Sequence, residues 1–135
     1  MHRKLNKKTA GFTLVEIMIV VAIIALLASI AVPNFLRSRK RSQATQVLQD
    51  LRILDAAVDL YAIENSKVGG FNPVFADLKN YIKTGTRLYA SGGTGADILG
   101  NAFGPYTVDT APKVSAASFT SLSDVAPAAF WSPYK

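Results

Sequence analysis

The stretch FTLVEIMIVVAIIALLASIAVPNFL, residues 12–36, decides the fold of this 135-residue chain. Only five of its 25 residues are not apolar, and the last 20, Ile17 to Leu36, carry no charge. As an α-helix rising about 1.5 Å per residue, these 20 residues span roughly 30 Å, the thickness of the hydrocarbon core of a bilayer. Apolar side chains lie on every face, so the helix is not an amphipathic surface helix. The stretch predicts a membrane-spanning segment.

The net charge of +6 comes from the N-terminal region. Residues 1–41 hold eight Lys or Arg and one acid, whereas residues 42–135 hold seven Lys or Arg and eight acids. Basic clusters flank the apolar stretch on both sides, so counting positive charges does not orient it. A nucleic-acid-binding stripe at Arg37–Arg41 is the weaker interpretation, because no interleaved aromatics or groove-entering motif accompany it. Nucleic acid is therefore not an expected partner.

The composition excludes much enzyme chemistry. The chain has no Cys, and its only His is His2. Disulfides, thiolate nucleophiles and Cys-based zinc sites are excluded, and a Ser-His-Asp triad would require the second residue. The stretch Gly92-Gly93-Thr94-Gly95 lacks the Gly-Lys-Ser/Thr of a phosphate loop, so we interpret it as a mobile turn. The sequence favours a protein that is not an enzyme.

Glu16 is the one charge inside the apolar stretch. An unpaired carboxylate in hydrocarbon costs several kcal/mol, so it must be neutralised, paired or placed near the interface. One interpretation is a carboxylate in the first helical turns, favoured there by the helix dipole. The other is a binding group for a cation that arrives from another molecule within the membrane. The residues themselves leave both open.

Basic residues lead into Gly11-Phe12-Thr13-Leu14-Val15-Glu16. This motif closely resembles the class III signal of type IV prepilins and type II secretion pseudopilins, and the resemblance extends in pattern to about residue 64. It implies that a membrane prepilin peptidase cuts between Gly11 and Phe12 and methylates the new amine of Phe12. It also implies that Glu16 receives that amine from a neighbouring subunit during filament assembly.

Two other interpretations of the N-terminal region are weaker. A cleaved secretory signal could end at Ser29-Ile30-Ala31, but the apolar run is too long and the mature chain would begin almost at Arg37–Arg41. A plain membrane anchor explains the hydrophobicity, but neither Glu16 nor the helical pattern that follows. We therefore divide the region into a cleaved leader, 1–11, and a transmembrane or filament-core helix half, 12–36.

Residues 37–65 are predicted to continue the same helix as an amphipathic half. Pro33 should kink this helix rather than end it, because helical periodicity resumes afterwards. An apolar stripe with alternating four- and three-residue steps predicts the face that a covering domain buries. Its members are Val47, Leu51, Leu54, Val58 and Tyr61.

Residues 66–135 are predicted to form a small globular head, so the expected fold class is α+β and pilin-like, with the long helix packed against a small antiparallel sheet. Asn72-Pro73 predicts the start of a short helix that Gly85 closes. The candidate strands are Arg87–Ala90, Tyr106–Val108 and, more weakly, Ser118–Leu122. Six aromatic residues lie in the last 33 positions, and we expect them to pack this sheet over the helix stripe rather than form a surface patch for a ligand.

Two further features bear on the choice of filament. Residues 97–106 are similar to a stretch that precedes a strand in the major pseudopilins of type II secretion, although Ile98 and Leu99 replace its proline and tryptophan. The resemblance also implies a calcium-binding loop, for which Asp109 and Asp124 are the candidate carboxylates. Two isolated aspartates serve more often as turn caps. We therefore expect no cofactor, with Ca²⁺ as the alternative.

The sequence predicts a structural subunit of a type IV pilus-like filament. A type II secretion pseudopilin involved in protein export is favoured, and a type IV pilin for adhesion, motility or DNA uptake is the alternative. A membrane-anchored enzyme or binding domain is more remote. The expected partners are further copies, the prepilin peptidase, the inner-membrane assembly platform, minor pilins or pseudopilins, and membrane lipid. The expected location is the inner membrane, followed by a periplasmic or cell-surface filament.

Overall fold

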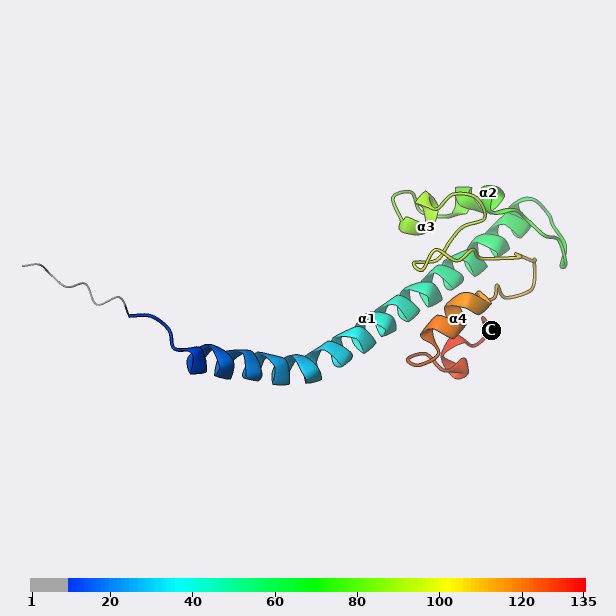
Figure 1. Cartoon of the computed structure of the whole chain (residues 1–135). Helices are drawn as coiled ribbons and strands as arrows, with labels where there is room; N and C mark the ends of the chain where they lie inside the picture. Colours follow the sequence, from blue (N-terminus) through cyan, green and yellow to red (C-terminus); the bar gives the residue numbers. More distant parts are fainter. Residues whose placement is uncertain (1–9) are drawn as a thin grey trace, which may run out of the picture. The chain divides into compact units, whose positions relative to one another are not determined.

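The computed structural model describes residues 10–135, and residues 1–9, most of the predicted leader, lie outside the described residues. The chain divides into two compact units, Met1–Leu36 and Arg37–Lys135. Helix α1 (Leu14–Glu64) contributes to both (Figure 1). The elements that follow it are short: α2 (Phe75–Leu78), the 3-10 helix η1 (Lys79–Tyr81), α3 (Arg87–Ala90), α4 (Ala116–Leu122) and the 3-10 helix η2 (Ala128–Trp131).

Helix α1 is continuous over 51 residues, as the sequence predicts. Pro33 lies inside it. Proline removes one backbone donor but its fixed φ suits a helix, so the hydrogen-bonded turns on either side carry the chain through. The prediction that Pro33 does not end the helix is confirmed, whereas the kink at Pro33 stays a prediction.

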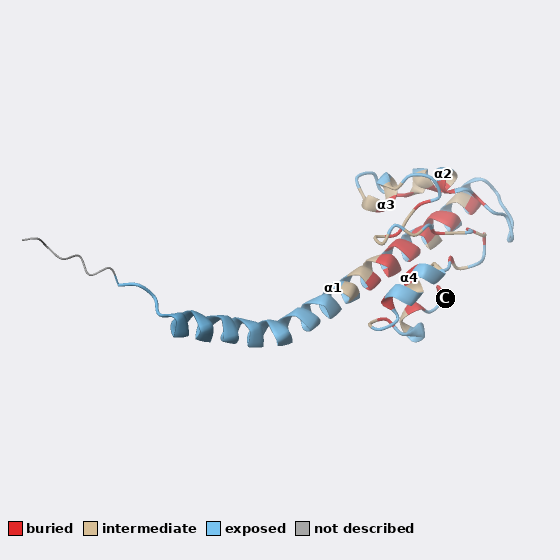
Figure 2. Cartoon of the chain, in the orientation of Figure 1, coloured by how far each residue is buried: buried red, intermediate tan, exposed pale blue. Residues whose placement is uncertain are grey.

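The part of α1 before Arg37 is exposed on all sides, and Figure 2 shows it in one colour. It is long and apolar enough to cross a membrane. Soluble proteins rarely expose so much contiguous apolar surface. This half of the helix therefore needs lipid or other helices around it.

The distal part of α1 has one buried face, which carries the red segments of Figure 2. Four members of the predicted stripe are buried, and the fifth, Tyr61, is half-buried. Leu51 and Leu54 have no exposed surface at all. The periodicity of the sequence thus predicted the correct face of the helix.

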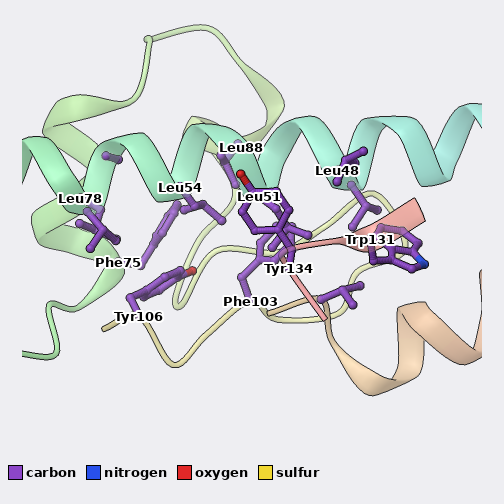
Figure 3. Close-up of a cluster of buried hydrophobic side chains, with 14 of the residues drawn as sticks. Leu48, Leu51, Leu54, Phe75, Leu78, Leu88, Phe103, Tyr106, Trp131 and Tyr134 are labelled. Carbon is purple, nitrogen blue, oxygen red and sulfur yellow. The ribbon is translucent and has the colours of Figure 1, made fainter. Parts of the chain in front are cut away.

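The rest of the chain supplies the other side of this core, seen in Figure 3. The side chain of Trp131 is fully buried, and its indole N–H donates to the Ala126 carbonyl. Of the six C-terminal aromatics, four are buried and two are partly buried against the core. The expectation that they pack over the helix stripe is confirmed, although no sheet carries them. The buried partners of α1 are Phe75, Leu78, Ile82, Leu88, Phe103, Tyr106, Val108, Val114, Leu122, Ala126, Trp131 and Tyr134.

The predicted antiparallel sheet is absent from residues 10–135, which contain no β-strand. Two isolated antiparallel bridges, Ala96 with Ala102 and Thr107 with Thr110, are the only β-type pairing in this part of the chain. The predicted strand Tyr106–Val108 lies in the irregular segment around the second bridge. The head of this fold is therefore built from short helices and loops.

Two of the predicted strands are helices because hydroxyl side chains cap them. The Thr86 hydroxyl accepts from the Tyr89 N–H and begins α3 at the position of the first predicted strand. The Ser115 hydroxyl accepts from the Ser118 N–H and begins α4 at the other. A capping hydroxyl satisfies a backbone donor that the helix itself leaves free, and this local gain outweighs a weak strand propensity.

The predicted short helix is present, but it begins later than Asn72-Pro73 indicates and ends before Gly85, since α2 stops at Leu78 and η1 at Tyr81. Helix α2 starts after Val74, whose N–H donates to the Asp77 carboxylate. The Asn72 side chain is used elsewhere, because its carbonyl oxygen accepts from the Thr107 hydroxyl at 2.8 Å. This bond ties the start of the head to a segment 35 residues further along the chain.

A buried carboxylate organises the loop between α3 and α4. Asp97 is 2% exposed, and its Oδ1 accepts from the N–H groups of Leu99 and Asn101, both at 2.9 Å. Its Oδ2 accepts from the hydroxyl of Ser118 in α4, which also accepts from the Asn101 amide. A buried carboxylate is tolerated when its oxygens are satisfied in this way.

An ion pair joins α3 to α1. Arg87 donates to the carboxylate of Asp50, which is 6% exposed, and also to the Ala96 carbonyl at 3.1 Å. Burial raises the pKa of the Asp50 carboxyl, while the Arg87 guanidinium acts in the opposite direction. Removing one partner would leave a buried charge unpaired, so the pair holds α3 in place against α1.

We predict that Asp97→Ala lowers the free energy of unfolding by about 3 kcal/mol, because several buried donors lose one charged acceptor. The measurement is urea unfolding of the full chain in detergent micelles, followed by the fluorescence of the single, buried Trp131. Asp59→Ala is the matched control. Asp59 is exposed, so its removal should change the free energy by less than about 0.5 kcal/mol. Equal effects of the two substitutions would contradict the role given to Asp97.

Candidate functional site

The predicted cleavage site lies in an exposed, irregular segment just before α1. Neither Gly11 nor Phe12 belongs to a helix or strand, and the Phe12 side chain is 86% exposed. Apart from its two chain neighbours, no atom of residues 10–135 lies within 4 Å of the position that a Cβ at Gly11 would take. Exposed irregular backbone is where proteases cut most readily, since it can extend into their active sites. The peptide bond between Gly11 and Phe12 is thus accessible.

Thr13 and Glu16 form a reciprocal cap at the start of α1. The Thr13 N–H donates to Glu16 Oε2 at 2.7 Å, and the Glu16 N–H donates to the Thr13 hydroxyl at 3.2 Å. This is a capping box, in which the N-cap residue and the third helical residue each satisfy the other's backbone donor. The acidic side chain also lies in the first helical turn, where the helix dipole favours it.

The cap leaves Glu16 able to accept a further hydrogen bond. Its Oε2 accepts from Thr13, while Oε1 has no partner within the described residues. An ionised carboxylate has about four acceptor sites on its two oxygens. The side chain is also exposed, so a cation can approach it. The arrangement can hold the helix cap and an ammonium group together, so the two interpretations of Glu16 do not exclude each other.

The capping box can be recognised in the sequence, although we did not predict it from the residues. Thr-x-x-Glu before an apolar run is the pattern of a capping box, and Thr13 and Glu16 match it. The helix dipole accounts for an acidic residue in the first turn, but it does not connect Glu16 to a particular partner. Thr13 was therefore missed, although its spacing from Glu16 is visible in the sequence.

The calcium candidates Asp109 and Asp124 have different neighbours. Asp124 pairs with Lys40 at 2.9 Å, and the hydrogen bond from Lys40 lowers the pKa of its carboxyl. Asp109 has a left-handed backbone, φ 64°, and its carboxylate lies beside Gly69. Between residues 10 and 135 no three His, Asp or Glu side chains come together as a metal-binding group. Calcium binding at Asp109 and Asp124 stays a prediction.

The glycine-rich stretch 92–95 is a packed turn of the head. The Gly95 N–H donates to the Gly92 carbonyl, and the Thr94 carbonyl accepts from the Tyr106 hydroxyl at 2.6 Å. Gly95 has a φ of 77°, and a Cβ there would lie 2.7 Å from the ring of Phe75. Only glycine fits this conformation and this space. Gly95 thus packs against the core, and the stretch is a turn, as the sequence predicts, whereas its mobility stays a prediction.

Comparison with known proteins identifies the N-terminal region. Residues 6–32 match the model of the prokaryotic N-terminal methylation motif. The chain is 39% identical over 61 residues to type II secretion system core protein G of Klebsiella pneumoniae, covering 45% of this chain and 44% of that protein. It is 41% identical over 64 residues to the protein of the same name from Vibrio cholerae, covering 47% and 43% of the two chains.

A pilin is also among the relatives. The chain is 40% identical over 68 residues to the type IV major pilin protein PilA of Myxococcus xanthus, covering 50% of this chain and 31% of that protein. The aligned region spans less than half the length of these curated relatives. No solved structure matches the chain. The N-terminal part of the chain is thus similar to that of pilins and of type II secretion core G proteins.

We predict that Thr13→Val opens the start of α1, because valine keeps the shape of threonine but offers no acceptor to the Glu16 N–H. Losing an N-cap costs about 1 kcal/mol, so the Glu16 amide should exchange its hydrogen about fivefold faster. NMR-detected hydrogen exchange of the full chain in micelles measures this rate. Thr45→Val is the control, since the Thr45 hydroxyl donates to the Arg41 carbonyl far from this end. An unchanged Glu16 rate in Thr13→Val would show that no cap forms.

Proposed function

We propose that this chain is a structural subunit of a type IV pilus-like filament, and that this filament is the pseudopilus of a type II secretion system. One observation carries the first part: an exposed Gly11–Phe12 bond stands directly before a helix whose first half is apolar on every face and uncovered. The relatives named type II secretion system core protein G support the second part.

The precursor would wait in the inner membrane with its basic leader on the cytoplasmic side. The exposed segment at Gly11–Phe12 would enter the prepilin peptidase, which cuts the bond and methylates the amine of Phe12. Cleavage removes four of the chain's Lys and Arg residues. The new N-terminal amine then lies next to Thr13, at the start of α1.

Glu16 would pair with the Phe12 amine of a neighbouring subunit through the carboxylate oxygen that the cap leaves free. Each charge is costly inside an apolar bundle, and pairing the two lowers the cost of both. A subunit that docked at the wrong axial position would leave Glu16 unpaired, so the pair selects the register of assembly. Most cohesion would come from packing of the apolar helix halves, which stay away from water as they move from lipid into the bundle.

Other partners follow from the same proposal. An assembly platform in the inner membrane would extract the processed subunit, and minor pseudopilins would join the filament. Asp109 and Asp124 remain the residues at which a bound Ca²⁺ would be sought. None of these three curated relatives carries the name of an enzyme, which supports a purely structural role.

A surface type IV pilus is the second candidate, and the Myxococcus xanthus pilin is the observation in its favour. The two filaments differ in location, since a pseudopilus lies in the periplasm whereas a pilus extends from the cell. Abundant long fibres of this subunit in material sheared from cells would favour the pilus. An anchored enzyme is a remote third candidate, and its activity would not depend on Glu16.

We predict that the mature subunit begins with an N-methylated Phe12. The measurement is mass spectrometry of the N-terminal peptide from membranes of cells that express the peptidase. Cells without the peptidase are the control, and there the chain should retain residues 1–11. A mature chain that starts anywhere other than Phe12 would overturn the proposal.

We also predict that Glu16→Gln abolishes filament assembly while leaving cleavage intact. Glutamine can still accept the Thr13 N–H, so it keeps the cap and removes only the charge. Glu16→Ala removes both and should fail equally. The readouts are the proportion of cleaved subunit and the amount of filament recovered from the same cells. Normal filaments from Glu16→Gln would mean that Glu16 serves only as a helix cap.

A further inference from the structure

Exposed large apolar side chains gather in two places within the unit Arg37–Lys135. One group lies on α1: Ile53, Leu60 and Ile63. The other lies in the segment before α2: Val68, Phe71 and Val74. Monomeric proteins rarely leave such groups uncovered, and exposed apolar patches often mark interaction surfaces.

The first group belongs to an outer stripe of α1. Its positions follow one another at steps of four and three residues, so they share one face of the helix. All are exposed, none is charged, and the core-facing residues such as Leu51 and Leu54 lie on a different face. Leu60 is 52% exposed at the centre of the apolar part. The outer stripe consists of Thr45, Gln49, Ile53, Ala56, Leu60 and Ile63.

Val74 of the second group lines an apolar groove, here called the Val74 groove. Its volume is about 390 Å³, and its lining combines the start of α2 with the turn at Gly93–Thr94 and the segment Phe103–Tyr106. Phe75 and Tyr106 stack with ring centroids 6.3 Å apart and lie next to each other in Figure 3. Val74, 60% exposed, lies at its edge. No lining residue carries a charge, and none comes from α1.

The outer stripe and the Val74 groove thus share no residue and lie on different elements of one unit. Two different surfaces of one chain that fit each other make a heterologous contact, which repeats from copy to copy and builds an open helical array. Resting on the filament proposed above, we propose that the outer stripe of one subunit packs into the Val74 groove of the next. The occupant of the groove is therefore a second copy of this chain, which inserts the side chains of Leu60 and its stripe neighbours.

The charges on the two surfaces agree with this occupant. Arg52, Asp59 and Glu64 of α1 are exposed and border the outer stripe on its two edges, so they can stay at the solvent-facing rim while the groove covers the apolar side chains between them. The groove offers apolar walls and, at about 390 Å³, room for side chains from a single helix face. The stripe lies on the same helix as the apolar half that the proposed filament would bury, on the other side of the basic run Arg37–Arg41, so one helix would supply both contacts.

The absence of Cys from the chain makes a disulfide test direct. Leu60→Cys and Val74→Cys are made separately, and both sites are exposed, so folding is spared. Cells express one variant or both, and assembled filaments are oxidised and run on a non-reducing gel. A disulfide needs Cα atoms about 4.4–6.8 Å apart, so it reports direct contact. Ser123→Cys, at the exposed end of α4, replaces each variant in turn as the control.

We expect a dimer only when Leu60→Cys and Val74→Cys are expressed together, and none in any combination with Ser123→Cys. Dimers of Leu60→Cys by itself would show that stripe packs on stripe and would overturn the proposal. Filaments without the mixed dimer would also overturn it, while leaving the filament function intact. If even the unsubstituted chain forms no filament, the proposed function and this contact fail together.

Discussion

The fold of this protein depends on how the apolar surface of α1 is covered, and the two halves of this helix have different surroundings. The first half of α1 is apolar on every face and has no protein around it, so it requires lipid or other helices. The second half has one apolar face, and the remaining 71 residues fold against that face. The buried residues of the head come from segments scattered along residues 75–134, and they form one core together with Leu51 and Leu54 of α1.

The sequence predicted the parts of this fold that depend on a long, repeated pattern. The uncharged run to Leu36 indicated a membrane segment, and the stripe through Val47 and Val58 indicated the buried face. Both patterns extend over many residues, so a single exception such as Pro33 does not change the prediction. The motif around Gly11 and Glu16 was equally visible, because it depends on short spacings at the start of one helix.

The secondary structure of the head could not be predicted from the sequence, because its helices are short and the contacts that fix them join residues far apart in the chain. Helices α3 and α4 have four and seven residues, too few to show a period, and single hydroxyls at Thr86 and Ser115 decide their conformation. The Asp97 carboxylate meets Ser118 across 21 positions of the chain, and Arg87 meets Asp50 across 37. No local sequence pattern predicts such pairs. The strands were therefore predicted from residue propensity alone, and this prediction was wrong.

The head without strands has a consequence for how copies can meet. A sheet with an open edge offers unpaired backbone groups, to which almost any extended chain can add. Residues 10–135 present no such edge, because they contain no β-strand and only two isolated bridges. In the filament proposed above, recognition between copies would then depend on side chains, whose shape and charge differ from position to position. Single substitutions on such a head could then change its choice of neighbour, and the described residues offer no strand edge from which unspecific backbone pairing could start.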